Sequence, residues 1–386
     1  MGVAGASPPK GTFCEHQRCI AKATLTIAHS QGWTWQESAH SARVLNFAPS
    51  ELVWECRQEV IAECGYEPPE LPSLGLARKF HRVEQQPFDH WRELVQSYSG
   101  RNLTDFNDIL PAIVGLAIRV QEATNWKYYA GIWGHELPIN LLWEVTRSVD
   151  RQGDPLPKVP HPEDFSTGAP KPCRTPSWSW ASIQSKVRTS DTAMGFTKKY
   201  SGRDGHTTVD RSFAAMNIDV RYHKVEDMFP ADPDIPLGEV TGGRLIVQGR
   251  LIPATLTHEK DTRKGFEKIE RWYYFLNFDK DSGEKGRKIQ FSPDTELEPF
   301  LRPDEPSQNL SQSARRCNVE WAEFSAEVHC LLIAECPGVS GDLATCDGLV
   351  LGRSDDNWDY FKRIGYFCFP NSSHFRGLGY QKVTIA

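Results

Sequence analysis

The chain has 386 residues, of which 39% are hydrophobic and 24% charged, and this composition excludes a disordered protein. The formal net charge of -6 excludes a general attraction to nucleic acid or to an anionic membrane surface. There is no apolar run of about 18 residues, so we expect no transmembrane helix. The 10 cysteines include no CxxC pair, which favours reduced thiols in a cytoplasmic protein and no metal site.

The first 64 residues contain one clear strand pattern. In SELVWECRQ, residues 50–58, the side chains of Leu52, Trp54 and Cys56 occupy alternate positions and are expected on one face of a strand. The preceding stretch GWTWQESAHSARVLNF, residues 32–47, is rich in aromatic and apolar side chains. We therefore treat residues 1–64 as one segment, which ends before a proline-containing link.

Residues 65–152 are expected to form a helical region. In PFDHWRELVQSYSG, residues 87–100, apolar side chains recur three and four positions apart, as they do on the buried face of a helix. A second helix is expected to start close to Asp108, because Pro111 is tolerated only in a first helical turn. An apolar stripe that follows a proline predicts a third helix at residues 137–149.

A proline-rich stretch follows, with seven prolines in residues 153–176. Such a stretch is extended and hard to pack as regular structure, so we expect a crossing segment there. It leads into TPSWSWASI, residues 175–183, whose alternation predicts a strand with Trp178 and Trp180 on one buried face. The serines lack the glycines that a nucleophile elbow needs, so a structural seam is favoured over a catalytic serine or a ligand platform.

Residues 177–386 are expected to be mainly β. Short β-branched or aromatic runs, separated by Gly, Asp and Pro, occur at 214–225, 242–256, 269–278, 326–336, 347–354 and 360–369. These runs predict a curved antiparallel sheet or a partial barrel. The expected fold class is therefore α+β, with a helical N-terminal half followed by a mainly antiparallel β C-terminal half.

Several motifs resemble those of the fungal heterokaryon-incompatibility (HET) domain. GWTWQES, RVLNF and ELVWECR are similar to the closing segment of that domain. They are followed, in the family's order, by WRELVQSYSGRNLTDFNDILPAIVGLA, YYAGIWGHELPINLLWEV, RTPSWSWASI and GLVLGR with YFKRIGYFCF. The resemblance covers residues 21–183 well and residues 240–370 loosely.

The resemblance implies both a fold and a function. The family's opening segments, close to LSYCWG and WIDALCINQ, have no counterpart here. Residues 1–64 are therefore expected to be a partial HET-like segment, a truncated domain that keeps the last elements of a TIR-like α/β unit. The family implies a role in fungal heterokaryon incompatibility, non-self recognition and programmed cell death, mainly through association with other proteins of an incompatibility pathway.

The TIR-like resemblance also implies candidate site residues. Glu37 is the candidate catalytic carboxylate of an NAD-consuming enzyme, because a carboxylate stabilises the positive charge that develops as a glycosidic bond breaks. Trp33, Trp35 and Trp54 are candidates for binding a ring, and Gln36 and Arg43 for polar contacts. The alternatives are a surface or capping role for Glu37 and a place in the core for the three tryptophans.

Other functional classes stay open on the sequence. The 12 tryptophans and 19 phenylalanines would allow a biosynthetic enzyme to bind an apolar small molecule between the two halves, near Trp133, Trp178 or His135. A purely structural protein is the third alternative. No GxxxxGK[ST] loop and no GxGxxG motif follows a predicted strand, so no cofactor is expected.

Overall fold

The computed structural model describes residues 32–47, 52–65, 87–101, 103, 105–146, 175–183, 185–189, 217–261, 271–278, 289–295, 297, 324–336, 345–354, 357–369 and 373–386. Of the expected crossing segment at 153–176, only the last two residues belong to this part of the chain. Residues 1–31 of the expected partial HET-like segment lie outside it.

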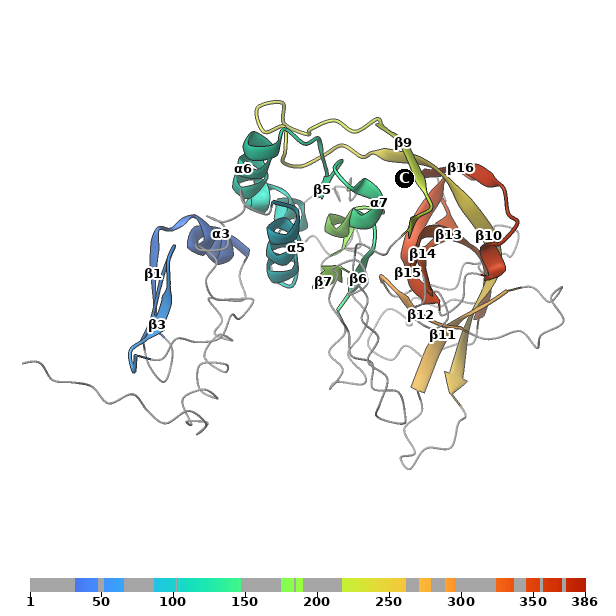
Figure 1. Ribbon diagram of the computed structural model, residues 1–386, viewed down its shortest axis with the longest axis horizontal. Coiled ribbons are helices and arrows are strands. Elements are labelled where there is room, and N and C mark those ends of the chain that lie inside the picture. The colour runs from blue at the N-terminus through green and yellow to red at the C-terminus, as the bar shows by residue number, and fades with distance from the viewer. Residues whose placement is uncertain are drawn as a thin grey trace, which may run out of the picture.

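The N-terminal elements are a helix and a small sheet, which lie at one end of the molecule in Figure 1. They are α3 (Gly32–His40), β1 (Arg43–Phe47), β2 (Leu52–Cys56) and β3 (Val60–Ala62). The middle strand, β2, pairs antiparallel with both neighbours, and Leu45 lies directly opposite Trp54. Because side chains alternate along a strand, Leu52, Trp54 and Cys56 share one face, as their spacing predicts.

A helical layer follows. It consists of α5 (Pro87–Tyr98), the 3₁₀-helices η1 (Phe106–Ile109) and η2 (Pro111–Ile113), α6 (Val114–Thr124) and the short α7 (Leu137–Asn140). The carboxylate of Asp105 caps η1 by accepting the backbone N–H of Asn107 at 2.9 Å. Pro111 begins η2, and Asn125 ends α6 in the left-handed conformation. Figure 1 shows α5 and α6 side by side, with α3 close to them.

Short strands interrupt the helical layer. β4 (Tyr128–Tyr129) pairs with β5 (Ile132–Trp133), and β6 (Trp143–Val145) pairs with β7 (Val187–Thr189). The helix expected at 137–149 is therefore wrong, since α7 has 4 residues and the chain then extends into β6. The cause is tertiary: β6 pairs with a strand far along the chain, and this pairing outweighs local helix propensity.

The C-terminal residues form one large mixed sheet. Its strands are β8 (Asn217–Ile218), β9 (Arg221–Glu226), β10 (Arg244–Asp261), β11 (Arg271–Asn277), β12 (Ile289–Pro293), β13 (Phe324–Cys336), β14 (Thr345–Arg353), β15 (Phe361–Phe369) and β16 (Tyr380–Ile385). Going round from β10, the pairings run through β13, β14, β15, β12 and β11 back to β10, so these six strands close into a ring (Figure 1). We call it the strand ring. All its pairs are antiparallel, whereas β15 and β16 pair in parallel.

Both faces of the central ring strands are buried. Along β13, Leu331 and Ile333 belong to the core shared with the helical layer. Cys330 and Leu332, which alternate with them, belong to a second core, to which all six ring strands contribute. This double burial explains why these strands read as nearly continuous apolar runs in the sequence. The strand ring is thus attached to the helical layer along part of its outer surface.

The expected α+β division, with a helical N-terminal half and a TIR-like remnant, is wrong. The described residues contain more strand than helix, and strands β1 to β7 all lie in the N-terminal half. Residues 43–62 form consecutive antiparallel strands, whereas the last elements of an α/β unit would be parallel strands joined by helices. A short aromatic run fits the periodicity of a helix and that of a strand equally well, and only the segment it pairs with decides between them. The helical expectation for the N-terminal half was wrong for this reason.

TPSWSWASI is a turn followed by the 3₁₀-helix η4 (Trp180–Ser182), so the strand expected there is also wrong. The Ser179 hydroxyl accepts the backbone N–H of Ala181 at 3.0 Å, and this cap turns the chain out of an extended conformation. The expected burial of both indoles is confirmed, because Trp178 is 0% and Trp180 3% exposed. Depth of burial followed from residue type, whereas the backbone conformation did not.

Candidate functional site

Helix α3 carries four of the six residues predicted as a site, and it divides them between two faces. Trp33 and Glu37 lie one helical turn apart on the exposed face. The indole N–H of Trp33 bonds to the carboxylate of Asp108, which opposes the rise in the pKa of Asp108 that burial causes. Trp35 lies on the other face, fully buried, and its indole N–H donates to the Ser97 hydroxyl at 3.0 Å. Trp35 is therefore part of the core.

The remaining predicted residues do not close a pocket with Glu37. Gln36 is half-buried, and Arg43 is exposed at the start of β1. The backbone carbonyl of Glu37 accepts the backbone N–H and the hydroxyl of Ser41, at 3.0 and 2.7 Å. Neither of the two cavities discussed below borders α3. Glu37 thus lies on an open helix surface, and a catalytic role for it stays a prediction.

Large apolar side chains lie exposed on one face of the small sheet next to α3. Leu45 is 46%, Phe47 77% and Trp54 38% exposed. Leu45 and Trp54 are directly opposite each other, and Phe47 follows on the same side of β1. We call these three residues the apolar face. The other side of the same sheet is buried at Val53 and Val60, so the sheet has one covered and one open side.

A positive charge borders the apolar face. Arg43 precedes Leu45 by two positions and therefore lies on the same side of β1. Within the described residues, the guanidinium of Arg43 pairs with no carboxylate. On the covered side of the sheet, Glu55 is buried and accepts the side-chain N–H of Asn46 at 2.6 Å. The open side therefore combines apolar surface with one cation at its edge.

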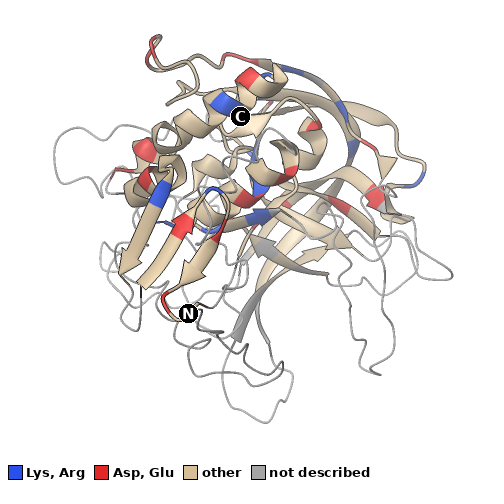
Figure 2. Ribbon diagram, turned by 60° about the vertical axis from the view of Figure 1, so that its left-hand side comes forward, with Lys and Arg blue, Asp and Glu red and all other residues tan. Residues whose placement is uncertain are grey.

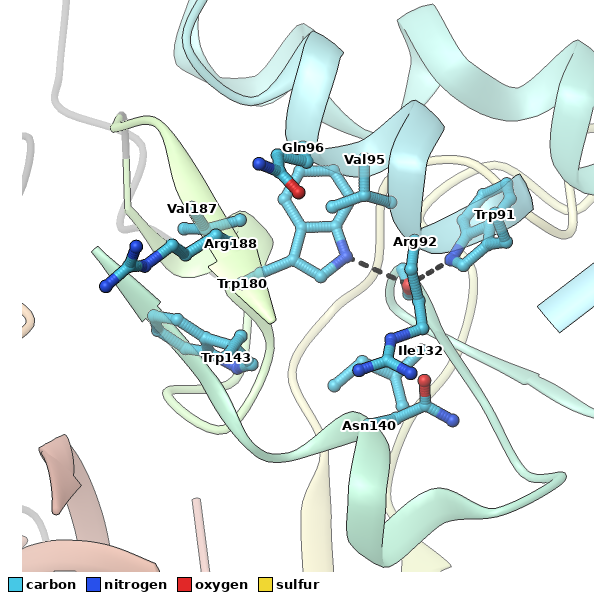
Figure 3. A pocket seen from close by; sticks show the side chains of 11 residues that line it. Trp91, Arg92, Val95, Gln96, Ile132, Asn140, Trp143, Trp180, Val187 and Arg188 are labelled. Atoms are coloured by element: carbon cyan, nitrogen blue, oxygen red, sulfur yellow. Dashed lines mark hydrogen bonds between the residues drawn. The ribbon is translucent and has the colours of Figure 1, made fainter. Parts of the chain in front are cut away.

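The buried aromatic residues meet around the carbonyl oxygen of Gly131. It accepts the indole N–H of Trp91 at 3.2 Å and that of Trp180 at 2.9 Å (Figure 3). Gly131 has a φ of 90°, and a Cβ there would lie 2.7 Å from the indole nitrogen of Trp180, so the position requires glycine. The two indoles fasten α5 and η4 to the turn between β4 and β5.

The cavity beside this junction has room for about one water molecule. Arg92 of α5, Trp143 of β6 and Arg188 of β7 line it together with Trp180 (Figure 3), and its volume is ≈ 20 Å³. Burial lowers the pKa of Arg92 to about 10. Small-molecule pockets measure roughly 300 Å³ or more, so this cavity is too small for the apolar substrate considered from the sequence.

The serine hydroxyls of TPSWSWASI all donate to backbone carbonyls. Ser177 donates to the carbonyl of Ala386, and Ser179 donates to that of Ala130. Ser182 donates to the carbonyl of Ser179 at 2.8 Å. These bonds tie the turn to the end of the chain and to the β4–β5 hairpin, which supports a structural role and leaves no activated nucleophile.

Arg363 and Asp294 form a buried ion pair that no sequence motif announces. The guanidinium Nε lies 2.7 Å from Asp294 Oδ2. The same guanidinium donates to the carbonyls of Leu141 and Trp143 and lies 3.3 Å from the centre of the Trp143 ring. Burial lowers the pKa of Arg363, and Asp294 opposes that shift. The ion pair connects β15 to the residue that follows β12, and the bonds from Arg363 to the two carbonyls connect β15 to β6. The only signal in the sequence is a charged residue within an aromatic strand.

Figure 2 shows acidic and basic residues interspersed over the described elements. No helix in the described part of the chain is both long and apolar enough to cross a bilayer. Comparisons with protein-family models, with curated proteins and with solved structures found no match. A function must therefore be inferred from the residues of this chain.

Proposed function

We propose that this chain is a HET-like fungal protein of the heterokaryon-incompatibility, non-self recognition type, and that it acts in the cytoplasm mainly by associating with another protein of such a pathway. The ordered motif series supports the HET-like assignment. The observation that carries the association is the apolar face of Leu45, Phe47 and Trp54. Single exposed apolar residues are ordinary, whereas adjacent large ones mark an interaction surface.

The apolar face has the composition and the rigidity of a binding surface. Tryptophan and other aromatic residues are enriched among the residues that dominate interface affinity. Covering Phe47 and Trp54 removes apolar area from water, which contributes about 25 cal/mol per Å². Burial of Val53 and Val60 holds the sheet from its other side, so little conformational entropy is lost when a partner binds.

The partner that fits this surface is a different protein with an apolar patch and a carboxylate at the edge of that patch. The carboxylate would pair with Arg43 at the rim of the contact and favour one orientation of the partner. The net charge of -6 opposes the close approach of a second copy of this chain. A hetero-complex is therefore favoured over a homodimer.

The test uses the full chain and a matched pair of variants. Phe47→Thr/Trp54→Thr removes the apolar face but keeps residues that favour strands. Trp358→Thr removes a tryptophan that is 67% exposed outside the apolar face and serves as the control. Proteins captured from a fungal lysate are identified, purified and mixed with each variant. We expect a purified partner to bind the control like the wild type and the double variant at least about tenfold more weakly.

Two results would contradict this proposal. The first is that every purified partner binds the double variant as tightly as it binds the wild type, which would show that the apolar face is not the contact. Alternatively, the wild-type chain dimerises by itself and the double variant does not, in which case a second copy occupies the face.

A further inference from the structure

A groove lies between the β4–β5 hairpin and β9, away from the apolar face. Its volume is ≈ 460 Å³, and the side chains that shape it include Trp126, Lys127, Tyr129, His135, Tyr222 and Lys224. Pockets for small ligands span roughly 300–1,000 Å³, so the space suits a small molecule. We call it the hairpin groove.

One wall of the hairpin groove is a fixed aromatic surface. The indole of Trp126 stacks on the imidazole of His135, with ring centroids 4.0 Å apart and an angle of 10° between the planes. Trp133 packs edge-on against Trp126 at 6.3 Å, and Phe88 packs edge-on against His135 at 6.1 Å. Because these neighbours hold the stacked pair in place, a planar ring that enters the groove meets an aromatic surface that needs no rearrangement.

Two lysines line the hairpin groove, Lys127 directly before β4 and Lys224 on β9. Lys224 forms an ion pair with Glu226, which also lies 3.8 Å from the guanidinium of Arg244. Lys127 has no carboxylate partner in the described part of the chain. The charge of Lys127 is therefore available to an anion, and Lys224 can exchange its half-exposed partner Glu226 for an anionic ligand.

Two tyrosine hydroxyls add hydrogen-bond donors. The hydroxyl oxygens of Tyr129 and Tyr222 lie 3.3 Å apart, which places them within hydrogen-bond distance of each other. Burial raises the pKa of Tyr129, and the bond to Tyr222 raises it further, so the Tyr129 hydroxyl stays protonated. One hydrogen bond between two hydroxyls leaves one proton to donate to a ligand oxygen.

Residues with a positive φ lie on the two segments that form the hairpin groove. Within the described residues, the non-glycine positions with positive φ are Asn125, Ala130, Glu136 and Asp227, with φ between 46° and 55°. The first three lie in or beside the β4–β5 hairpin, and Asp227 directly follows β9. Asn125 is the C-cap of α6 and Ala130 lies in the two-residue turn of the hairpin, where a positive φ is ordinary. Glu136 and Asp227 have no such role, and each lies within two residues of a residue that lines the groove. Such conformations are unfavourable for residues with a Cβ and are often kept where a binding site needs them.

We propose that the hairpin groove binds a small molecule that joins a planar aromatic ring to a phosphate group. The ring stacks against the Trp126–His135 wall, and the phosphate pairs with Lys127 and Lys224. A phosphate offers three acceptor oxygens, which match two ammonium groups and one tyrosine hydroxyl better than the two oxygens of a carboxylate.

The test measures binding to the full chain by isothermal titration calorimetry. Adenosine 5′-monophosphate is the probe, and adenosine and inorganic phosphate are tested separately as its ring part and its anionic part. We expect the nucleotide to bind at least about tenfold more tightly than either part, because it uses both walls of the groove. Its affinity should fall as salt is added, since salt screens the lysine–phosphate attraction.

Matched variants test the named residues. Trp126→Leu should weaken nucleotide binding by roughly 5- to 150-fold, the range for stacking on one aromatic side chain, and Lys127→Gln by about tenfold. Trp358→Leu and Lys186→Gln change exposed residues of the same types elsewhere and should leave the affinity unchanged. Unchanged melting curves show that each variant is folded.

Several outcomes would overturn the proposal. One is that the nucleotide gives no binding heat. Another is that Trp126→Leu and Lys127→Gln bind the nucleotide with the affinity of the wild type. If adenosine binds as tightly as the nucleotide, the phosphate contacts are wrong, and if phosphate alone binds as tightly, the ring contact is wrong.

Discussion

Tryptophans occur both in the TPSWSWASI turn and in the small N-terminal sheet, but the two regions place them differently. In the turn, the indole N–H of Trp178 donates to the carbonyl of Gly243 at 3.3 Å, and Trp180 is likewise bonded and buried. In the sheet, Trp54 and Phe47 face outward on the open side. The first region joins the helical layer to the strand ring, whereas the second lies at one end of the molecule (Figure 1).

This difference teaches that an aromatic motif does not by itself distinguish a stabilising residue from a binding residue. A buried indole whose N–H is bonded contributes to folding and has nothing left to offer a ligand. An exposed indole contributes little to folding and is available to a partner. Substitutions in the two regions should therefore separate by their effect on the free energy of unfolding.

The largest effect is expected where the strand ring meets the helical layer. Arg363→Met leaves the Asp294 carboxylate buried without its guanidinium and deprives the carbonyls of Leu141 and Trp143 of a donor. Breaking a buried ion pair from one side costs about 3–5 kcal/mol, and we expect the upper end of this range in urea denaturation.

The double variant Arg363→Met/Asp294→Leu is the control for this prediction. It should recover part of the loss, because it also removes the buried carboxylate. If Arg363→Met alone lowers the free energy of unfolding by less than about 1 kcal/mol, its effect equals that of a surface ion pair. This result would show that Arg363 does not hold the strand ring to the helical layer.

A smaller effect is expected at Gly131, where strain and crowding combine. Gly131→Ala should reduce the free energy of unfolding by about 2–3 kcal/mol, because the new Cβ meets the Trp180 indole and the φ of 90° disfavours alanine. Gly377→Ala isolates the strain, since its φ is 79° and nothing lies within 4 Å of the new Cβ, and it should cost only about 1 kcal/mol. Equal losses in the two variants would mean that the contact with Trp180 is unimportant.

The smallest effect on stability is expected on the apolar face. Phe47→Thr should change the free energy of unfolding by no more than about 0.5 kcal/mol in urea denaturation, because the side chain is exposed and threonine favours strands. Val53→Thr on the covered side of the same sheet is the control and should be clearly destabilising. A loss of about 2 kcal/mol or more in Phe47→Thr would place that ring in a core.

Local periodicity located the elements whose pattern is long. Helix α5 occupies most of the helix expected at 87–100, and the runs at 326–336 and 360–369 coincide with β13 and β15. Elements that depend on distant pairing were not predictable in this way. The extended conformation of Trp143–Val145 depends on β7, and the closure of the strand ring depends on pairing β12 with β15.

The candidate surfaces could be predicted only in part. The alternation in ELVWECR correctly places Leu52 and Trp54 on one face of a strand, but whether that face is covered depends on the rest of the fold. The hairpin groove combines residues near Trp126 with Tyr222 and its neighbours on β9, which no local pattern connects. The burial of Arg363 within an aromatic strand is likewise decided by the partner that folding brings to it.

The most direct test of the central comparison replaces the same residue type in both regions and measures the free energy of unfolding by urea denaturation. We expect Trp178→Ala to lose about 3–5 kcal/mol, as large aromatic truncations in cores do, and Trp54→Ala to lose at most about 1 kcal/mol, the scale of one cross-strand pair. Equal losses in the two variants would contradict the division into a structural seam and an open binding face.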